Sequence, residues 1–324
     1  MKQPASEIPR LLLTIGDPNG IGPEIILKIF NDRPYISKKD LTVIGSKKIL
    51  DHYASLLNLK TIPKERILEI PLPSKFKINP GKTEKNAGKY SGDAVKTAIE
   101  LCLKKEFDGM ITLPISKESF NLGGYNYPGH TEMLGKLTSS GDIVMILYSK
   151  EFSVALVTGH IPVSKVSKAL NEKLLIKKII TVNNSLVKNF GIKNPKIAVL
   201  SLNPHAGDGG LIGKEEQDII SPVIEEMNSI GFNLRGPFAS DGYFANKSYK
   251  KFDITIAMYH DQGLIPFKMI SFDKGVNFTA GLKIIRTSPD HGTAFDIAGM
   301  GIANAESTKQ AIILNYKLQI ANYK

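Results

Sequence analysis

The sequence has almost no cysteine and no long apolar run, and both shortages narrow the class of protein. Cys102 is the only cysteine among 324 residues, so the chain can form neither an intrachain disulfide nor a cysteine-based zinc site. No apolar stretch approaches the ~20 residues that a helix needs to cross a bilayer. LLLTI near the N-terminus is too short for a signal-peptide core, and no cleavage pattern of small residues follows it. We therefore expect a soluble protein of the reducing cytoplasm.

A dense basic tail is also missing, although the net charge is +11. The lysines are spread along the chain, as in SKK, EKLLIKK and KSYKKF, and no basic stripe interleaved with aromatic residues is present. A nucleic-acid-binding protein stays open as an alternative, but a solvated basic surface explains the charge more simply. Small anionic ligands such as phosphates are compatible with it.

Short apolar runs alternate with helical segments along most of the chain. RLLLTI, DLTVIGS, DGMITL and PKIAVLSL lack an alternating apolar–polar pattern, which is typical of strands covered on both faces. This order predicts an α/β fold with mainly parallel sheet, and the length favours two domains. Residues 142–159 are the exception and predict an antiparallel hairpin.

Three further segments have a recognisable character. Residues 73–90 are polar and lysine-rich, and we expect a mobile surface connection there. Residues 121–130 are dense in glycine, asparagine and proline, and predict a crossing between domains. The end of the chain predicts a helix with Asn304 or Ser307 as its cap.

Five of the six histidines lie at or just after the end of an apolar run, next to glycine or proline; His52, in a helical stretch, is the exception and is expected to be structural. In open α/β sheets the ligand crevice lies beyond the carboxyl ends of the strands. Three histidines follow strands closely and are therefore expected to converge in this crevice: His160, His205 and His260. Three neutral imidazoles at one point suit Zn²⁺ or a similar divalent ion. Their separations match no local zinc motif, so three structural histidines remain the alternative. Asp261 or Asp241 is a candidate to orient a metal-binding histidine.

The stretch AMYHDQGLIPFK, residues 257–268, continues a run predicted to be a buried strand. The run is followed by three polar residues in succession, His260, Asp261 and Gln262. The triplet either caps the strand or is presented to a ligand. We favour presentation, with Gly263 and Pro266 shaping a turn that leads to Lys268.

Two glycine-rich segments resemble ligand loops. Residues 14–25, TIGDPNGIGPEI, run from strand to helix, but their glycines do not follow the G-x-G-x-x-G order, so tight-turn chemistry is the better interpretation. Residues 286–307 contain small and polar residues that allow a flat ligand to approach the backbone. A loop that caps the last helix is the alternative there.

Together, GDPNGIGPE, YPGHTEML, LNPHAGDGG, YHDQGLIPFK and GVNFTAGLKIIRTSPDHGTAFDIAGMG resemble the 4-hydroxythreonine-4-phosphate dehydrogenases, NAD-dependent enzymes of pyridoxal phosphate biosynthesis. The resemblance extends from Thr14 to Asn304. HGTAFDIAGMGIAN is also similar, more distantly, to a stretch of the isopropylmalate and isocitrate dehydrogenases. The resemblance implies the fold of the isopropylmalate and isocitrate dehydrogenases, with two α/β/α domains and a cleft between them. The first domain would consist of residues 1–127 and 285–324 and lie on the cofactor side. The second would consist of residues 128–284 and serve metal binding and dimerisation.

The resemblance also implies roles for individual residues. A divalent metal, Zn²⁺, Mg²⁺ or Co²⁺, would be held by the three histidines named above at the interface of a homodimer, with His260 donated by the neighbouring subunit. The substrate would contact His130, Thr131, Lys268, Asn277 and Arg286. NAD would lie along DHGTAFD and contact His291, Gly292, Thr293 and Asp296. The carboxylate of Asp296 would repel a 2′-phosphate and so favour NAD over NADP.

The implied reaction is the oxidation of 4-phosphohydroxy-L-threonine to a β-keto acid, which loses CO₂ to give 3-amino-2-oxopropyl phosphate. Asp241, Asp261 and Lys117 are candidates for the general base by their position in the sequence. A dehydrogenase of a related four-carbon phosphate, D-threonate or D-erythronate 4-phosphate, is the first alternative. A metal-dependent hydrolase or aldolase that uses the same histidines is the second.

Overall fold

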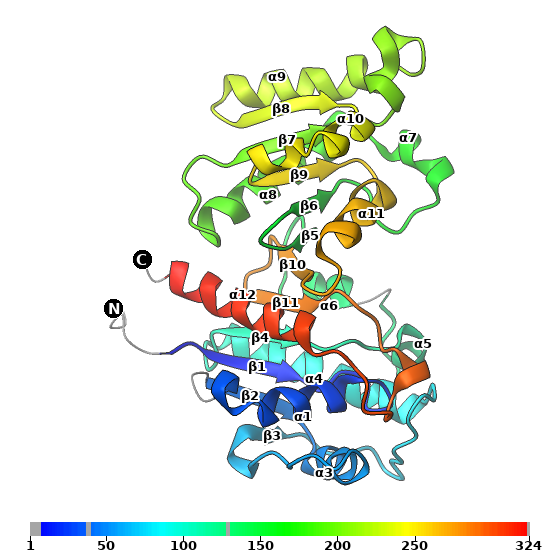
Figure 1. The fold of residues 1–324 in the computed structure, drawn as a ribbon, viewed down its shortest axis with the longest axis vertical. Helices are drawn as coiled ribbons and strands as arrows, with labels where there is room; N and C mark the ends of the chain where they lie inside the picture. The colour runs from blue at the N-terminus through cyan, green and yellow to red at the C-terminus, as the bar shows by residue number, and fades with distance from the viewer. Residues whose placement is uncertain (1–7, 37–39, 128–129, 323–324) are drawn as a thin grey trace. The chain divides into compact units, whose positions relative to one another are not determined.

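The computed structural model describes residues 8–36, 40–127 and 130–322, and the chain divides into two compact units. Unit 1 consists of residues 1–140 and 282–324, so it holds both the blue start and the red end of the chain in Figure 1, and unit 2 consists of residues 141–281. The expected first boundary, at 127/128, precedes helix α6 (His130–Leu137). Because α6 packs against α4 (Lys85–Leu103), it belongs to unit 1 instead. The roles assigned to the two domains stay predictions.

Unit 1 is built on parallel strands in the order β3-β2-β1-β4-β11. Leu11 to Thr14 of β1 are buried at consecutive positions, and because successive side chains point to opposite faces, both faces of the strand are covered. Helix α4 packs on β1, β2 and β4, and α12 packs on β4 and β11. The other elements are β1 (Arg10–Thr14), α1 (Gly22–Asn31), α2 (Arg33–Ile36), β2 (Asp40–Gly45), α3 (Lys47–Leu56), η1 (Lys64–Arg66), β3 (Ile67–Glu69), β4 (Gly109–Thr112), α5 (Lys117–Leu122), β11 (Ile285–Pro289), η6 (Phe295–Ile297) and α12 (Glu306–Asn322).

Unit 2 has its strands in the order β10-β5-β6-β9-β7-β8. The hairpin predicted over 142–159 is confirmed, since β5 and β6 pair antiparallel, whereas β6, β9, β7 and β8 are mutually parallel. The elements are β5 (Val144–Tyr148), β6 (Ser153–Leu156), η2 (Val163–Lys165), α7 (Val166–Ala169), α8 (Glu172–Lys188), β7 (Lys196–Leu200), η3 (Pro204–Gly210), η4 (Glu216–Ile220), α9 (Ser221–Ser229), β8 (Asn233–Phe238), α10 (Ser240–Ala245), η5 (Ser248–Lys251), β9 (Ile254–Ala257), α11 (His260–Ser271) and β10 (Val276–Ala280).

The expected turn after β9 is wrong, because residues 260–271 form helix α11 with Pro266 inside it. Gly263 allows this helix to lie close to the sheet. A Cβ atom there would lie 2.9 Å from Cγ2 of Val154 and 3.0 Å from Cδ2 of Leu156. The glycine that resembled a turn residue is therefore a close-packing residue in a helix.

Residues 73–90 are also only partly a surface connection. Helix α4 begins at Lys85, and Tyr90 is fully buried. Gly88 resembled a loop residue in the sequence, but it lets α4 approach the backbone of Ser119 in α5. The predicted cap of the last helix is confirmed, since Oδ1 of Asn304 accepts a hydrogen bond of 2.8 Å from the amide of Glu306. Among the described residues, no helix is both long and apolar enough to span a bilayer.

The packing of α11 gives a first prediction. Replacing Gly263 by alanine should lower the free energy of unfolding by about 1–3 kcal/mol, because the added methyl group pushes α11 away from β6. Gly242→Ala is the matched control: Gly242 is also helical, and nothing lies within 4 Å of its Cβ position. That variant should be neutral or more stable by up to about 1 kcal/mol in denaturant titrations. Equal effects of the two substitutions would contradict the packing argument.

The turn between β1 and α1 gives a second prediction. Asp17 is fully buried, and burial raises the pKa of its carboxyl from 3.8 to about 6, against the lowering effect of the Asn19 amide. The protonated form is thus favoured by folding. Well below pH 3.8 both the folded and the unfolded chain hold this proton, whereas above pH 6 the folded protein carries the full cost of a buried charge.

Asp17→Asn should remove that titration. The free energy of unfolding of the variant, relative to the unmodified protein, should rise between pH 4 and pH 7 by up to about 3 kcal/mol. Denaturation of both proteins across this range measures the difference. Parallel stability profiles would mean that Asp17 is not the group concerned.

Candidate active site

Three histidine-bearing loops in unit 2 leave neighbouring parallel strands at the same edge of the sheet. β9 lies between β6 and β7, with Leu156 opposite Ala257 in the first pair. His160 follows β6, His260 follows β9 and begins α11, and His205 follows β7. The three histidines thus follow strand ends at one edge of this sheet, as predicted, while their metal-binding role stays a prediction.

Met258 ties two of these loops together. Its carbonyl oxygen accepts hydrogen bonds from the amide of Thr158 (3.1 Å) and from Oγ1 of the same residue (2.6 Å). The loop after β6 is thereby fixed to the end of β9. The rings of His160 and His260 in the same chain consequently lie close, with centroids 5.4 Å apart.

Gln262, the third member of the polar triplet, is a structural residue that the sequence did not identify as such. It is buried, and its Oε1 accepts a hydrogen bond of 2.7 Å from the amide of Met258. Its Nε2 donates to the carbonyl of Ser201 (2.5 Å) and to Oγ of Ser240 (2.9 Å). One amide side chain therefore joins the end of β9 to the end of β7 and the start of α10, where the exposed Asp241 lies.

Asp261 contacts the predicted metal ligand beside it. Its Oδ1 lies 2.6 Å from Nδ1 of His260, and the carboxylate is otherwise largely exposed. A carboxylate on one ring nitrogen fixes the orientation of an imidazole and leaves Nε2 for another partner. This contact suits the orienting role considered for Asp261.

His205 is presented by an unusual turn. Five consecutive residues, 205–209, have left-handed backbone angles, and three of them carry a Cβ atom: His205 (φ 51°), Ala206 (φ 53°) and Asp208 (φ 44°). Such angles are costly for residues other than glycine and persist only where surrounding contacts impose them.

Glu216 fixes the residues that lead into this turn. It is almost completely buried, and its Oε1 accepts from the amides of Leu202 (2.7 Å) and Asn203 (2.8 Å), while its Oε2 accepts from Nδ2 of Asn203 (2.9 Å). A Cβ atom on Gly207 would lie 2.7 Å from Oε2, so the turn is folded directly around this carboxylate. The role of Glu216 could not be identified from the sequence, because it depends on tertiary contacts with Leu202 and Asn203.

Imidazole nitrogen suits Zn²⁺ and Co²⁺ better than Mg²⁺, and the rings of two predicted ligands, His160 and His260, lie close to each other. Within the described part of a single chain, however, no group of three His, Cys, Asp or Glu side chains could hold a metal. His260 lies beside His160 of its own chain, whereas the resemblance implies that a neighbouring subunit donates it. A complete site needs a further ligand, and its source stays a prediction.

The predicted substrate residues lie on elements of both units. Arg286 on β11 is fully buried, and its Nε and Nη2 donate to Oγ1 of Thr112 at 2.9 and 2.6 Å. Burial lowers the pKa of its guanidinium to about 9, which an oxyanion nearby would counteract. Lys268 is exposed on α11, and Asn277 is half-buried on β10. The side chains of His130 and Thr131 lie outside the described residues.

The predicted cofactor segment is an irregular stretch of unit 1 between β11 and α12. Asp296 and Gly292 are exposed, and His291 and Thr293 are half-buried. Ala294 has left-handed backbone angles (φ 44°) immediately before the short helix η6. Lys117, a candidate base, is exposed at the start of α5.

The glycine-rich turn after β1 uses its amides within the protein. The amide of Asp17 donates to the carbonyl of Pro114 (2.8 Å), that of Gly20 to the carbonyl of Asp17 (2.9 Å), and that of Ile21 to the carbonyl of Thr293 (3.1 Å). These amides are not available to cradle a phosphate. The interpretation of residues 14–25 as a tight turn is thereby supported.

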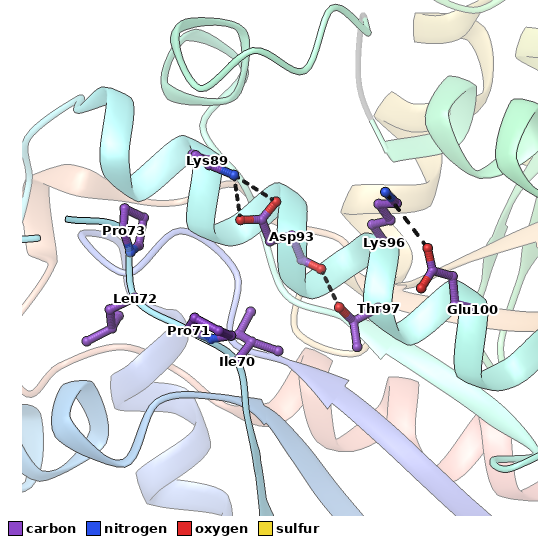
Figure 2. A pocket seen from close by; sticks show the side chains of 9 residues that line it. All are labelled: Ile70, Pro71, Leu72, Pro73, Lys89, Asp93, Lys96, Thr97 and Glu100. Carbon is purple, nitrogen blue, oxygen red and sulfur yellow. Dashed lines mark hydrogen bonds and ion pairs between the residues drawn. The ribbon is translucent and has the colours of Figure 1, made fainter.

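A surface pocket of ≈ 400 Å³ lies between α4 and the segment that follows β3 (Figure 2). Its cations are paired on the same helix, Lys89 with Asp93 at 3.0 Å and Lys96 with Glu100 at 3.9 Å. None of the predicted site residues lines it. The lining residues are Ile70, Pro71, Leu72, Pro73, Lys89, Asp93, Lys96, Thr97 and Glu100.

Comparison with known proteins agrees with the motifs. The family model described as "Pyridoxal phosphate biosynthetic protein PdxA" matches residues 37–315. The chain is 42% identical over 318 residues to a 4-hydroxythreonine-4-phosphate dehydrogenase of Sulfurihydrogenibium sp. (strain YO3AOP1), covering 94% of this chain and 97% of the relative. It is 38% identical over 330 residues to a D-threonate 4-phosphate dehydrogenase of Salmonella typhimurium (strain LT2), covering 97% and 100%.

Solved structures of the same fold include enzymes with the same name. The crystal structure of a 4-hydroxythreonine-4-phosphate dehydrogenase from Klebsiella pneumoniae superimposes with a TM-score of 0.85 at 34% identity, covering 97% of this chain and 99% of that one. The predicted fold class is confirmed, and so is the enzyme class, since these relatives are dehydrogenases. On the length and level of these matches, the chain belongs to the family of the pyridoxal phosphate biosynthetic protein PdxA.

Proposed function

We propose that this dehydrogenase transfers a hydride from the 3-hydroxyl carbon of 4-phosphohydroxy-L-threonine to NAD⁺, and that the β-keto acid formed loses CO₂ to give 3-amino-2-oxopropyl phosphate. The product would serve pyridoxal phosphate biosynthesis, as the family description indicates. The observation that carries the proposal is the set of histidine loops at the ends of β6, β9 and β7 in a chain of this family.

The metal would be held by His160, His205 and His260, whose nitrogen donors favour Zn²⁺ or Co²⁺ over Mg²⁺. A divalent ion there supplies Lewis-acid chemistry, which lowers the pKa of the substrate hydroxyl and stabilises the negative charge left by decarboxylation. Asp261 keeps the ring of His260 in one orientation through Nδ1. Because Asp261 is engaged there, Asp241 and Lys117 are the better candidates to accept the hydroxyl proton.

The substrate's anionic groups would bind the cations of the site. Arg286 offers a planar fork that suits an oxyanion, and Lys268 offers a point charge. His130, Thr131 and Asn277 would contribute hydrogen bonds to the polar groups of the substrate. These roles follow the family resemblance.

NAD would lie along residues 291–296, with contacts to His291, Gly292, Thr293 and Asp296. A nicotinamide cofactor supplies the hydride acceptor. The exposed carboxylate of Asp296 can accept hydrogen bonds from ribose hydroxyls and repels a 2′-phosphate, so we propose NAD rather than NADP.

A second candidate substrate is D-threonate 4-phosphate, because a relative at 38% identity carries that name. Both substrates offer a phosphate, a carboxylate and a hydroxyl to the same residues. The hydrolase or aldolase alternative leaves residues 291–296 without a role and is not favoured by the family.

Substrate oxidation is tested by following NADH absorbance with purified protein. We expect NADH formation from 4-phosphohydroxy-L-threonine, loss of activity with EDTA, and recovery with Zn²⁺ or Co²⁺. NAD⁺ should be preferred to NADP⁺, and Asp296→Lys should reduce that preference in kcat/KM. Activity on D-threonate or D-erythronate 4-phosphate alone would transfer the assignment to those substrates, and no activity on any of them would contradict the proposal.

We further propose that two copies of the chain share each metal site. Beyond the absence of a three-ligand group in the described part of one chain, large apolar side chains are exposed along α11 and at Phe272, the residue that follows it. Ile265 is 58% exposed, Met269 83% and Phe272 76%. Their spacing of three or four residues forms one stripe on the helix, a pattern typical of a face covered by a partner.

Subunit mixing tests the shared site. If the neighbour donates His260, inactive His160→Ala and His260→Ala proteins should regain about a quarter of wild-type activity after exchange, since half of the dimers are mixed and each has one intact site. If His160 and His260 act in one subunit and the neighbour donates His205, the pair His160→Ala with His205→Ala should recover instead. Recovery in neither mixture, with exchange demonstrated by a tagged subunit, would contradict sharing.

A further inference from the structure

The glycine-rich motif of residues 14–25 has no part in the function proposed above, yet it is bonded to the predicted cofactor segment at several points. Just before helix α1, the amide of Ile21 donates a hydrogen bond of 3.1 Å to the carbonyl of Thr293. A Cβ atom on Gly20 would lie 2.9 Å from the same carbonyl oxygen, so glycine is required for this approach. The turn and the segment therefore form one packed unit.

Glu24, in the first turn of α1, makes the strongest of these connections. Its side chain is fully buried, Oε1 accepts from the amide of Ala303 at 2.7 Å, and Oε2 accepts from the amide of Gly301 at 3.1 Å. Two backbone amides of an irregular loop are thus held by a single carboxylate. Charge-assisted bonds of this kind are stronger than those between neutral groups.

Lys28 completes the arrangement one turn later on α1. Its Nζ lies 2.8 Å from Oε1 of Glu24 and donates to the carbonyls of Gly301 (2.9 Å) and Ala303 (2.6 Å). The amides and the carbonyls of the same two residues are therefore all held by one ion pair. This pairing fixes both the position and the orientation of the loop.

The cofactor segment needs such support, because its own conformation is unfavourable. Ala294 lies in the left-handed region with φ 44°, and η6 extends for only three residues. Neither feature is self-stabilising, since a left-handed residue other than glycine is strained and so short a helix has few internal hydrogen bonds.

We propose that Glu24, together with Lys28, is a positioning residue for the nicotinamide cofactor, which holds residues 291–303 in the conformation that binds it. The inference rests on the proposed function, since it takes the cofactor to lie along this segment. A segment that is already ordered loses less conformational entropy on binding, so its anchor increases affinity without touching the ligand.

Glu24→Gln tests the role, because it keeps the shape of the side chain but turns an NH₂ group toward one of the two backbone amides. We expect the NADH dissociation constant, measured by fluorescence titration well below the melting temperature, to rise about tenfold. The kcat at saturating NAD⁺ and the Co²⁺ affinity should change by less than about twofold, since the histidines lie in unit 2. Lys28→Met leaves both amides bonded to Glu24. It should therefore raise the NADH dissociation constant by a smaller factor, about threefold. This variant serves as the test if Glu24→Gln does not fold.

Asp32→Asn is the matched control. It removes an ion pair of 2.5 Å with Lys309, just beyond the end of the same helix and away from residues 291–303. Its NADH dissociation constant should equal that of the wild type. The positioning role would be overturned if Glu24→Gln bound NADH as tightly as the wild type. The same holds for Lys28→Met if only that variant folds. An equal loss of NADH affinity in Asp32→Asn would overturn it as well. Failure of the wild type itself to bind NADH would instead overturn the proposed function.

Discussion

The parallel pairing of β6, β9 and β7 is the constraint on which the chemistry of unit 2 depends. Parallel neighbours end at the same edge of a sheet, so residues far apart in sequence are delivered to one place. The bonds around Met258 and Gln262 then convert neighbouring strand ends into fixed loops, which explains why the rings of His160 and His260 lie close together. Backbone geometry places these histidines, and the side-chain amide of Gln262 keeps them there.

Two buried carboxylates have parallel roles in the two units. Glu216 holds the residues that lead into the left-handed turn of His205, and Glu24 holds the C-terminal part of the predicted cofactor segment. In both cases the carboxylate accepts backbone amides of an irregular segment that has no strand or helix partner. Because a carboxylate has several acceptor positions in one plane, one side chain can fix a conformation that the backbone would not keep alone. His205 lies two residues after the amides bonded to Glu216, and residues 291–296, the predicted cofactor contacts, precede the amides bonded to Glu24.

The sequence predicts the strands, the hairpin and the strand-end histidines, because short apolar runs and their polar ends are local signals. It fails for α11, since Gly263 and Pro266 are turn residues by composition and only the neighbouring strand reveals that Gly263 is a packing residue. It also fails for Gln262, whose bonds reach residues that are distant in the chain. The roles of Arg286 and Asp296 came from the family motifs, because the residues alone left a structural role open for each.

The central claim is that the strand-end histidines form a metal site, and a titration of metal-free protein with Co²⁺ tests it most directly. The visible absorption of the bound ion reports its coordination independently of catalysis, and the account predicts one tightly bound Co²⁺ for each chain. His160→Ala and His260→Ala should each abolish that absorption, whereas His52→Ala, in helix α3, should leave it unchanged. Co²⁺ binding that survives both strand-end substitutions, or no binding by the wild type, would contradict the account.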